Sequence, residues 1–118
     1  MKTKLLLMVV LVAGITAGTA MSAVAADTLG LGLCAPMTGG AASWGQKAEV
    51  GAKFAIERIN ARGGVVPKGK SSAMNLELIE VADDKIDPRE GASIAQRFVD
   101  NEKILMMVGP LTSSVALA

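Results

Sequence analysis

The feature that most constrains the fold is a regular alternation of apolar segments with amphipathic ones along the chain. Residues 28–35 (TLGLGLCA) and 104–108 (ILMMV) have no polar face, which is typical of strands buried on both sides of a sheet. Residues 74–81 (MNLELIEV) begin by alternating apolar and polar side chains, which predicts a strand with one wetter face. The sequence therefore predicts three strands, of which the second is the most exposed.

Helical periodicity separates these strands, and a further helix is predicted to begin near Thr112. Residues 45–61 have an amphipathic pattern and are followed by Gly63, a typical helix-ending residue. Residues 87–101 begin with an N-cap aspartate, a proline and a glutamate, which together indicate a helix start. The predicted apolar face of the first helix is Ala48, Ala52, Ala55 and Ile59 with Phe54 and Ile56 beside them, and the polar face is Gln46, Glu49, Lys53, Glu57 and Asn60.

This β-α-β-α-β order predicts an α/β lobe of three layers, because strands that alternate with helices form right-handed crossovers and a parallel sheet. The wetter second strand is placed at the edge, which gives the strand order 2-1-3. Ligands of open parallel sheets bind at the carboxyl ends of the strands, beside the point where the strand order reverses. Residues 35–45 and 109–114 flank that point and are predicted to form two walls of a site.

The first wall combines small residues with Trp44, the only tryptophan of the chain. Small side chains let a ligand approach the backbone, and the indole offers a broad apolar face. The second wall carries Thr112, Ser113 and Ser114, whose hydroxyls and N–H groups at a helix start favour a carboxylate. Simple capping of the helix by Thr112 or Ser113 is the alternative, but the opposite wall favours a small-molecule ligand.

Enzyme chemistry finds little support in these residues. The chain has no histidine, so Ser113 and Ser114 lack an imidazole base, and no glycine follows them to form a nucleophile elbow. Residues 30–35 match G-x-G-x-x-A, but too little chain precedes them for the strand that this motif requires. Asp83 and Asp84 lack a third carboxylate at the end of the next strand, and we expect them to accept hydrogen bonds from loop N–H groups. The sequence thus predicts no catalytic residue, metal or cofactor.

The first 25 residues are predicted to be a signal peptide. Lys2 and Lys4 precede an apolar run over residues 5–12, and small residues near Ala25 suit signal peptidase, with cleavage after Ala26 as a less favoured alternative. The apolar run is short for a membrane anchor, the other interpretation of this segment. We therefore expect an exported protein.

Charge and cysteine content limit the partners and modifications that we expect for the mature segment, residues 26–118. The 12 basic and 11 acidic residues include two lysines of the signal peptide, so the rest is close to neutral and offers no basic surface for nucleic acid. Cys34 is the only cysteine; Leu33 before it does not fit a lipidation signal, and we expect a buried thiol at a strand end. The sequence stops where a new helix begins, which predicts one structural unit that is part of a longer chain.

Three blocks carry a family resemblance: residues 36–65 (PMTGGAASWGQKAEVGAKFAIERINARGGV), 76–99 (LELIEVADDKIDPREGASIAQRFV) and 104–114 (ILMMVGPLTSS). They resemble the start of the periplasmic leucine/isoleucine/valine-type binding proteins, which are type I solute-binding proteins of ABC transporters. The resemblance runs from Thr28 to the last residue and covers about the first quarter of such a protein. It implies that residues 26–118 are the N-terminal part of lobe one of a two-lobed, periplasmic domain that closes on an amino acid and delivers it to ABC permease subunits.

The resemblance also assigns roles within the two walls. The position that resembles the aromatic residue against the ligand side chain is Trp44, and Ser113, with Thr112 and Ser114 beside it, resembles the carboxylate-binding turn. A disulfide of well-known members is missing, because its positions here look like Ile86 and Thr112. The alternative function is an exported sensing domain of the same fold that signals to a membrane partner; neighbouring permease or kinase genes would separate the two.

Overall fold

A computed structural model describes residues 28–117 of the chain, and the predicted signal peptide lies outside the described residues. None of the described helices combines the length and the apolar character needed to cross a membrane. The elements in chain order are β1 (Thr28–Ala35), the 3₁₀ turn η1 (Gly39–Ala41), α2 (Ala42–Ala61), β2 (Asn75–Asp83), α3 (Pro88–Asp100), β3 (Met106–Val108) and α4 (Ser113–Ala116).

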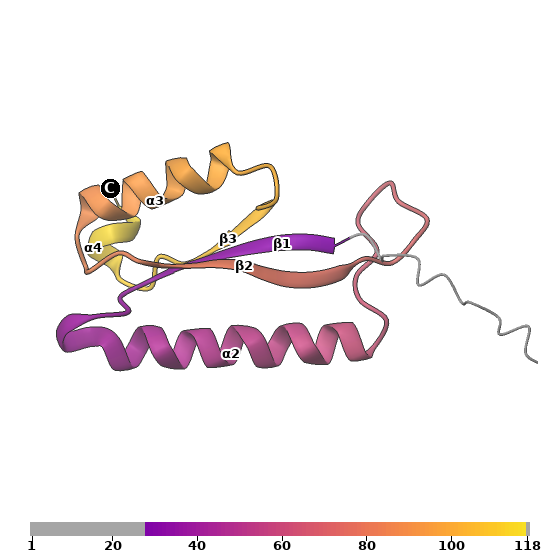
Figure 1. Ribbon diagram of the computed structural model, residues 1–118, viewed down its shortest axis with the longest axis horizontal. Coiled ribbons are helices and arrows are strands. Elements are labelled where there is room, and N and C mark those ends of the chain that lie inside the picture. Colours follow the sequence, from indigo (N-terminus) through magenta and orange to yellow (C-terminus); the bar gives the residue numbers. More distant parts are fainter. Residues whose placement is uncertain (1–27, 118) are drawn as a thin grey trace, which may run out of the picture.

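The three strands form one parallel sheet in the order β2-β1-β3, which confirms the predicted 2-1-3 order. The β1–β2 pairing runs from Thr28 opposite Asn75 to Ala35 opposite Asp83, with one register shift after Leu31. The β1–β3 pairing is short and starts with Leu31 opposite Met106. The helix α2 covers one face of the sheet, and α3 and α4 cover the other, so the predicted three layers are present (Figure 1).

The hydrophobic core lies between α3 and the sheet, where a cluster of buried side chains gathers: Cys34, Ala82, Ile94, Phe98 and Ile104. Alternation along β1 turns its glycines toward α3, because successive residues of a strand face opposite sides. A Cβ atom at Gly32 would lie only 2.5 Å from the Phe98 ring. The leucine–glycine alternation of β1 therefore lets α3 approach one face of the strand while Leu31 and Leu33 are buried as well.

The helix α3 begins as predicted. Asp87 is its N-cap and accepts a hydrogen bond from the Arg89 backbone N–H at 2.8 Å, with Pro88 as the first helical residue. Arg97 in the last turns of α3 reaches back to Glu80 of β2 with a 2.7 Å ion pair. The pair is one polar contact of the second strand, for which the sequence predicts a wetter face.

Several boundaries and one helix face differ from the predictions; the second strand, for example, ends at Asp83 instead of residue 81. The first helix begins at Ala42 instead of residue 45, so Trp44 lies in its first turn and not in a loop. The sequence predicts Ala55 on the apolar face of this helix and Phe54 beside it, but Ala55 is exposed and Phe54 is 58% exposed. Asn60, predicted on the polar face, faces β2 and bonds both the N–H and the C=O of Leu76. The third strand begins at Met106 instead of residue 104, because only residues 106–108 pair fully with β1.

Candidate functional site

The first wall of the predicted site is the segment between β1 and α2. After β1 ends, residues 36–38 lead into η1, and α2 follows directly. The first turn of α2 rests on this segment, since a Cβ atom at Gly45 would lie 2.1 Å from the Pro36 carbonyl oxygen. Only glycine allows this approach without moving the helix. Trp44, next to that contact, is 62% exposed at the start of α2.

Asp83, the last residue of β2, holds the first wall from the side. Its carboxylate accepts hydrogen bonds from the Met37 N–H at 2.8 Å, from the Thr38 hydroxyl and from the Lys85 N–H at 3.0 Å. Desolvation works to raise the pKa of Asp83, but the bonds from Thr38, Met37 and Lys85 outweigh it and lower the pKa below its usual value. Asp83 therefore stays ionised at neutral pH and acts purely as an acceptor.

Asp84 is fully buried and organises the turn that follows. It accepts a hydrogen bond from the Ile86 N–H at 2.9 Å, and the Cys34 thiol lies 3.7 Å from its other oxygen. Lys85 and Ile86 adopt the left-handed backbone region here, with φ of 52° and 60°. Both aspartates thus bond loop N–H groups, as the sequence predicts. Within residues 28–117 no group of three potential metal ligands is found near them or elsewhere.

Cys34 is fully buried at the end of β1, as predicted from the sequence. Burial raises the pKa of the Cys34 thiol to about 12, and the neighbouring Asp84 carboxylate adds to this rise. A thiol with such a pKa is protonated and unreactive at neutral pH. Cys34 is therefore part of the core and contributes no chemistry to the site.

The second wall is the turn between β3 and α4. Thr112 occupies the N-cap position of α4, but its side chain makes no capping hydrogen bond. Its Oγ1 atom is buried and has no partner among the described residues, whereas Ser113 and Ser114 are exposed. Side-chain capping, the alternative interpretation of Thr112, is thus absent from the described structure. The short helix is held by Val115, which packs against α3.

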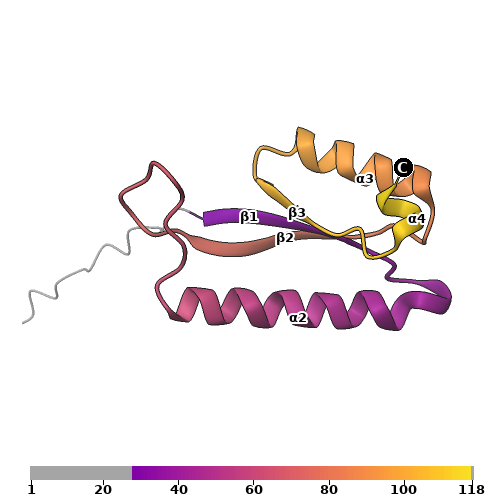
Figure 2. The same ribbon diagram turned by 180° about the vertical axis from the view of Figure 1, so that it is seen from behind.

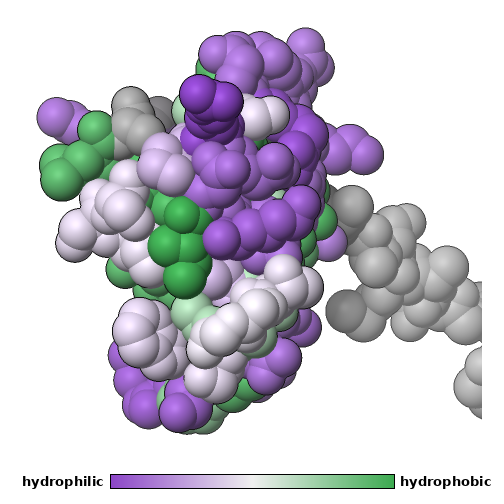
Figure 3. Space-filling model, turned by 90° about the vertical axis from the view of Figure 1, so that its left-hand side faces the viewer, coloured by the Kyte–Doolittle hydropathy of each residue, from purple (hydrophilic) through white to green (hydrophobic). Residues whose placement is uncertain are grey.

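The topology brings both walls to the carboxyl end of the sheet. The start of α2 and α4 lie at the same end of the molecule, on opposite faces of the sheet, in both views (Figures 1 and 2). No hydrogen bond described for residues 28–117 joins Trp44 to the three hydroxyl residues. Seen from this end, strongly hydrophilic surface gathers toward α3, paler surface lies toward the start of α2 above a hydrophilic lower edge, and a hydrophobic patch lies between them (Figure 3).

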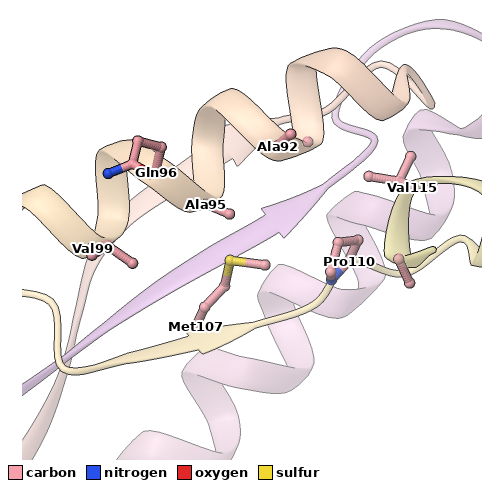
Figure 4. A pocket seen from close by; sticks show the side chains of 9 residues that line it. Ala92, Ala95, Gln96, Val99, Met107, Pro110 and Val115 are labelled. Carbon is pink, nitrogen blue, oxygen red and sulfur yellow. The ribbon is translucent and has the colours of Figure 1, made fainter. Parts of the chain in front are cut away.

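A separate apolar groove of about 350 Å³ lies between α3, β3 and α4 (Figure 4). Its lining is almost wholly aliphatic: Gly91, Ala92, Ala95, Gln96, Val99, Met107, Pro110, Val115 and Ala116. None of the four predicted site residues lines this groove. With only Gln96 as a polar side chain, the groove has no group that would orient a polar ligand.

Comparison with known proteins decides the family. A model described as "Periplasmic binding protein" matches residues 28–118. The chain belongs to this family. The match covers all described residues, and the expected resemblance is therefore confirmed.

Relatives of known name are amino-acid binding proteins. The Leu/Ile/Val-binding protein of Rhizobium johnstonii is 35% identical over 91% of this chain and 27% of its own length. The leucine-, isoleucine-, valine-, threonine- and alanine-binding protein of Pseudomonas aeruginosa is 37% identical over 83% of this chain and 24% of its own length. The chain thus spans about a quarter of the length of these relatives. They are binding proteins, which agrees with the expectation that the chain is not an enzyme.

Solved structures agree with the fold. The branched-chain amino acid transporter substrate binding protein LivJ from Streptococcus pneumoniae, in complex with isoleucine, superposes with a TM-score of 0.62 at 31% identity. The superposition covers 76% of this chain and 24% of that protein. The parallel β2-β1-β3 sheet with its helices is therefore part of a type I periplasmic binding protein fold.

Sequence reasoning missed the connection between Asp83 and the first wall in its detail. It predicted loop N–H partners for the aspartate pair, but it did not identify Met37 and Thr38 as those partners. The available signal was positional: Asp83 ends β2 opposite Ala35, which ends β1. Neighbouring parallel strands that end together place such a side chain beside the next loop.

Proposed function

We propose that this chain is the N-terminal part of a periplasmic solute-binding protein that captures an amino acid, of the branched-chain class, for an ABC importer. The observation that carries the proposal is the match over residues 28–118 together with relatives that are named for leucine, isoleucine and valine binding. The paler, weakly polar surface toward the start of α2 (Figure 3) supports it, since the aliphatic side chain of such a ligand needs a surface that is not strongly hydrophilic.

The two walls suit the two ends of such a ligand. Trp44 is exposed at the start of α2 and presents an aromatic face that can cover an aliphatic side chain. The turn of Thr112, Ser113 and Ser114 offers hydroxyls and backbone N–H groups, which bind a carboxylate. The unpartnered Oγ1 of Thr112 supports this assignment, because a buried hydroxyl without a partner is costly unless a ligand or water completes it.

The location and partners follow from the same proposal. We place the protein in the periplasm after removal of residues 1–25, with the permease subunits of an importer as its partners. No nucleic acid or cofactor has a role in this proposal.

Calorimetric titration tests the function. The protein is expressed from the complete reading frame in which this sequence lies, and each proteinogenic amino acid is titrated separately, together with urea and aromatic acids. We expect micromolar or tighter binding of leucine, isoleucine or valine, with no signal from polyanions such as short DNA. Binding confined to a ligand without a carboxylate would contradict the proposal.

A further inference from the structure

Asp83 stands at the junction of three segments near the proposed site. It lies at the carboxyl end of β2, opposite Ala35 of β1 in the sheet register. From there its carboxylate accepts hydrogen bonds from Met37 and Thr38 of the first wall and from Lys85 of its own turn. A single side chain of β2 is thus bonded to a segment more than 40 residues earlier in the sequence.

This segment supports the first turn of α2. Gly45 packs directly on the Pro36 carbonyl, and a Cβ atom there would also lie 2.9 Å from Met37 Sδ. The first turn of α2, which carries Trp44, therefore packs on residues 36–37 and is in direct contact with them.

Side-chain caps do not stabilise the segment on which α2 packs. Neither η1 nor α2 has a side-chain cap at its N-terminus, and no acidic residue lies in the first turn of α2. Thr38 occupies the N-cap position of η1, where a hydroxyl usually bonds the turn that follows. Its hydroxyl instead donates to Asp83. Among the described contacts, Asp83 is thus the side chain that holds residues 37–38.

We propose that Asp83 is a positioning residue of the ligand site: through Met37 and Thr38 it holds the first turn of α2 so that Trp44 covers the bound ligand. This inference rests on the proposed function. Asp83 acts through the loop and does not itself touch the ligand. Of its two adjacent charged neighbours, Asp84 bonds the Ile86 N–H and lies beside the Cys34 thiol, and Lys85 donates its backbone N–H to Asp83; neither has a described hydrogen bond to residues 36–38.

Four substitutions test the role, in protein expressed from the complete reading frame. Asp83→Asn keeps the shape but weakens the acceptor, and Thr38→Val removes one of its donors while Thr38→Ser keeps it. Glu77→Gln is the matched control, since it removes a negative charge from the exposed part of the same strand. Two properties are measured: leucine affinity by calorimetry, and hydrogen exchange of residues 36–46 without ligand.

We expect Asp83→Asn to weaken leucine binding about tenfold and to speed exchange in residues 36–46, because a charge-assisted hydrogen bond is lost. Thr38→Val should act in the same direction, while Thr38→Ser and Glu77→Gln should behave like the parent protein. If Asp83→Asn lowers only the melting temperature and leaves both affinity and local exchange unchanged, the positioning role is wrong. If the parent protein binds no amino acid, the proposed function is wrong, and faster exchange in Asp83→Asn would still support the contact on its own.

Discussion

At the scale of single residues, the candidate site depends on a few side chains whose surroundings differ sharply. Trp44 is exposed at the start of α2, Ser113 is exposed at the start of α4, and Cys34 is enclosed between them in the core. Exposure at the carboxyl end of the sheet makes the first two candidates for ligand contact. Because Cys34 is buried, the reactivity of its thiol reports whether the core is intact.

Trp44→Ala is expected to weaken binding of the best amino-acid ligand roughly ten- to hundredfold, because a large apolar contact is lost. Trp44→Phe should retain most of the affinity, since it keeps an aromatic face. Calorimetric titration of both variants checks this. An unchanged affinity in Trp44→Ala would remove the first wall from the site.

Ser113→Ala is expected to weaken carboxylate ligands by about 1.5–3 kcal/mol, the usual loss for a hydrogen bond to a charged group. The corresponding amide, such as leucinamide compared with leucine, should be affected much less. The comparison of the two ligands is the decisive measurement. An equal loss for both would indicate that Ser113 only supports the local fold.

The raised pKa of Cys34 makes the free energy of unfolding depend on pH, and the sign of this dependence follows from the direction of the shift. The folded thiol ionises only near pH 12, whereas the unfolded thiol ionises from its ordinary value of 9.0. The stability linked to the neutral thiol is therefore complete below pH 9 and is lost as the pH rises toward 12.

Iodoacetamide at pH 8 should alkylate Cys34 slowly in the folded protein and rapidly in urea. Rapid alkylation of the folded protein would show that the core is open at β1.

At the scale of elements, β1 and α3 pack closely against each other. The glycine face of β1 receives the Phe98 ring, and the other face buries Leu31 and Leu33. The helix approaches the strand so closely that even one methyl group at Gly32 overlaps the ring. The distance between α3 and the sheet thus depends on a missing side chain.

Gly32→Ala is expected to destabilise the fold by about 1–3 kcal/mol, because overpacking forces Phe98 or α3 to move. Phe98→Leu in the same chain should recover part of this loss by making room for the methyl group. Urea unfolding of the single and double variants measures the coupling. Strictly additive losses would contradict direct contact between the two positions.

At the scale of the whole molecule, the described segment leaves the outer edge of β3 without a paired strand. β3 pairs only with β1, and Leu105 and Met106 next to its outer edge are 66% and 55% exposed. Val99 of α3, one of the residues that line the apolar groove, is exposed on the same flank. Exposed apolar edges of this kind promote association between chains.

Residues 26–118 expressed alone are therefore expected to be poorly soluble or partly molten and to bind amino acids with millimolar affinity at best. α4 has only four residues and cannot present a stable carboxylate turn without further packing. Thermal melting followed by circular dichroism, with leucine titration, checks this. A cooperative melt together with micromolar binding by this segment would falsify the expectation.

Local patterns in the sequence were enough to predict the element order, the parallel 2-1-3 sheet, the Asp87 cap and the burial of Cys34. These follow from short-range periodicity and from the apolar character of whole segments. Tertiary contacts decided the rest. α2 begins at Ala42. The segment before it is fixed by hydrogen bonds from Met37 and Thr38 to Asp83 and by the packing of Gly45 on Pro36. Asn60 turns toward β2 because the backbone of Leu76 needs partners there, and Phe54 is left exposed. These boundaries and orientations depend on contacts between residues far apart in the chain, and local periodicity does not reveal such contacts.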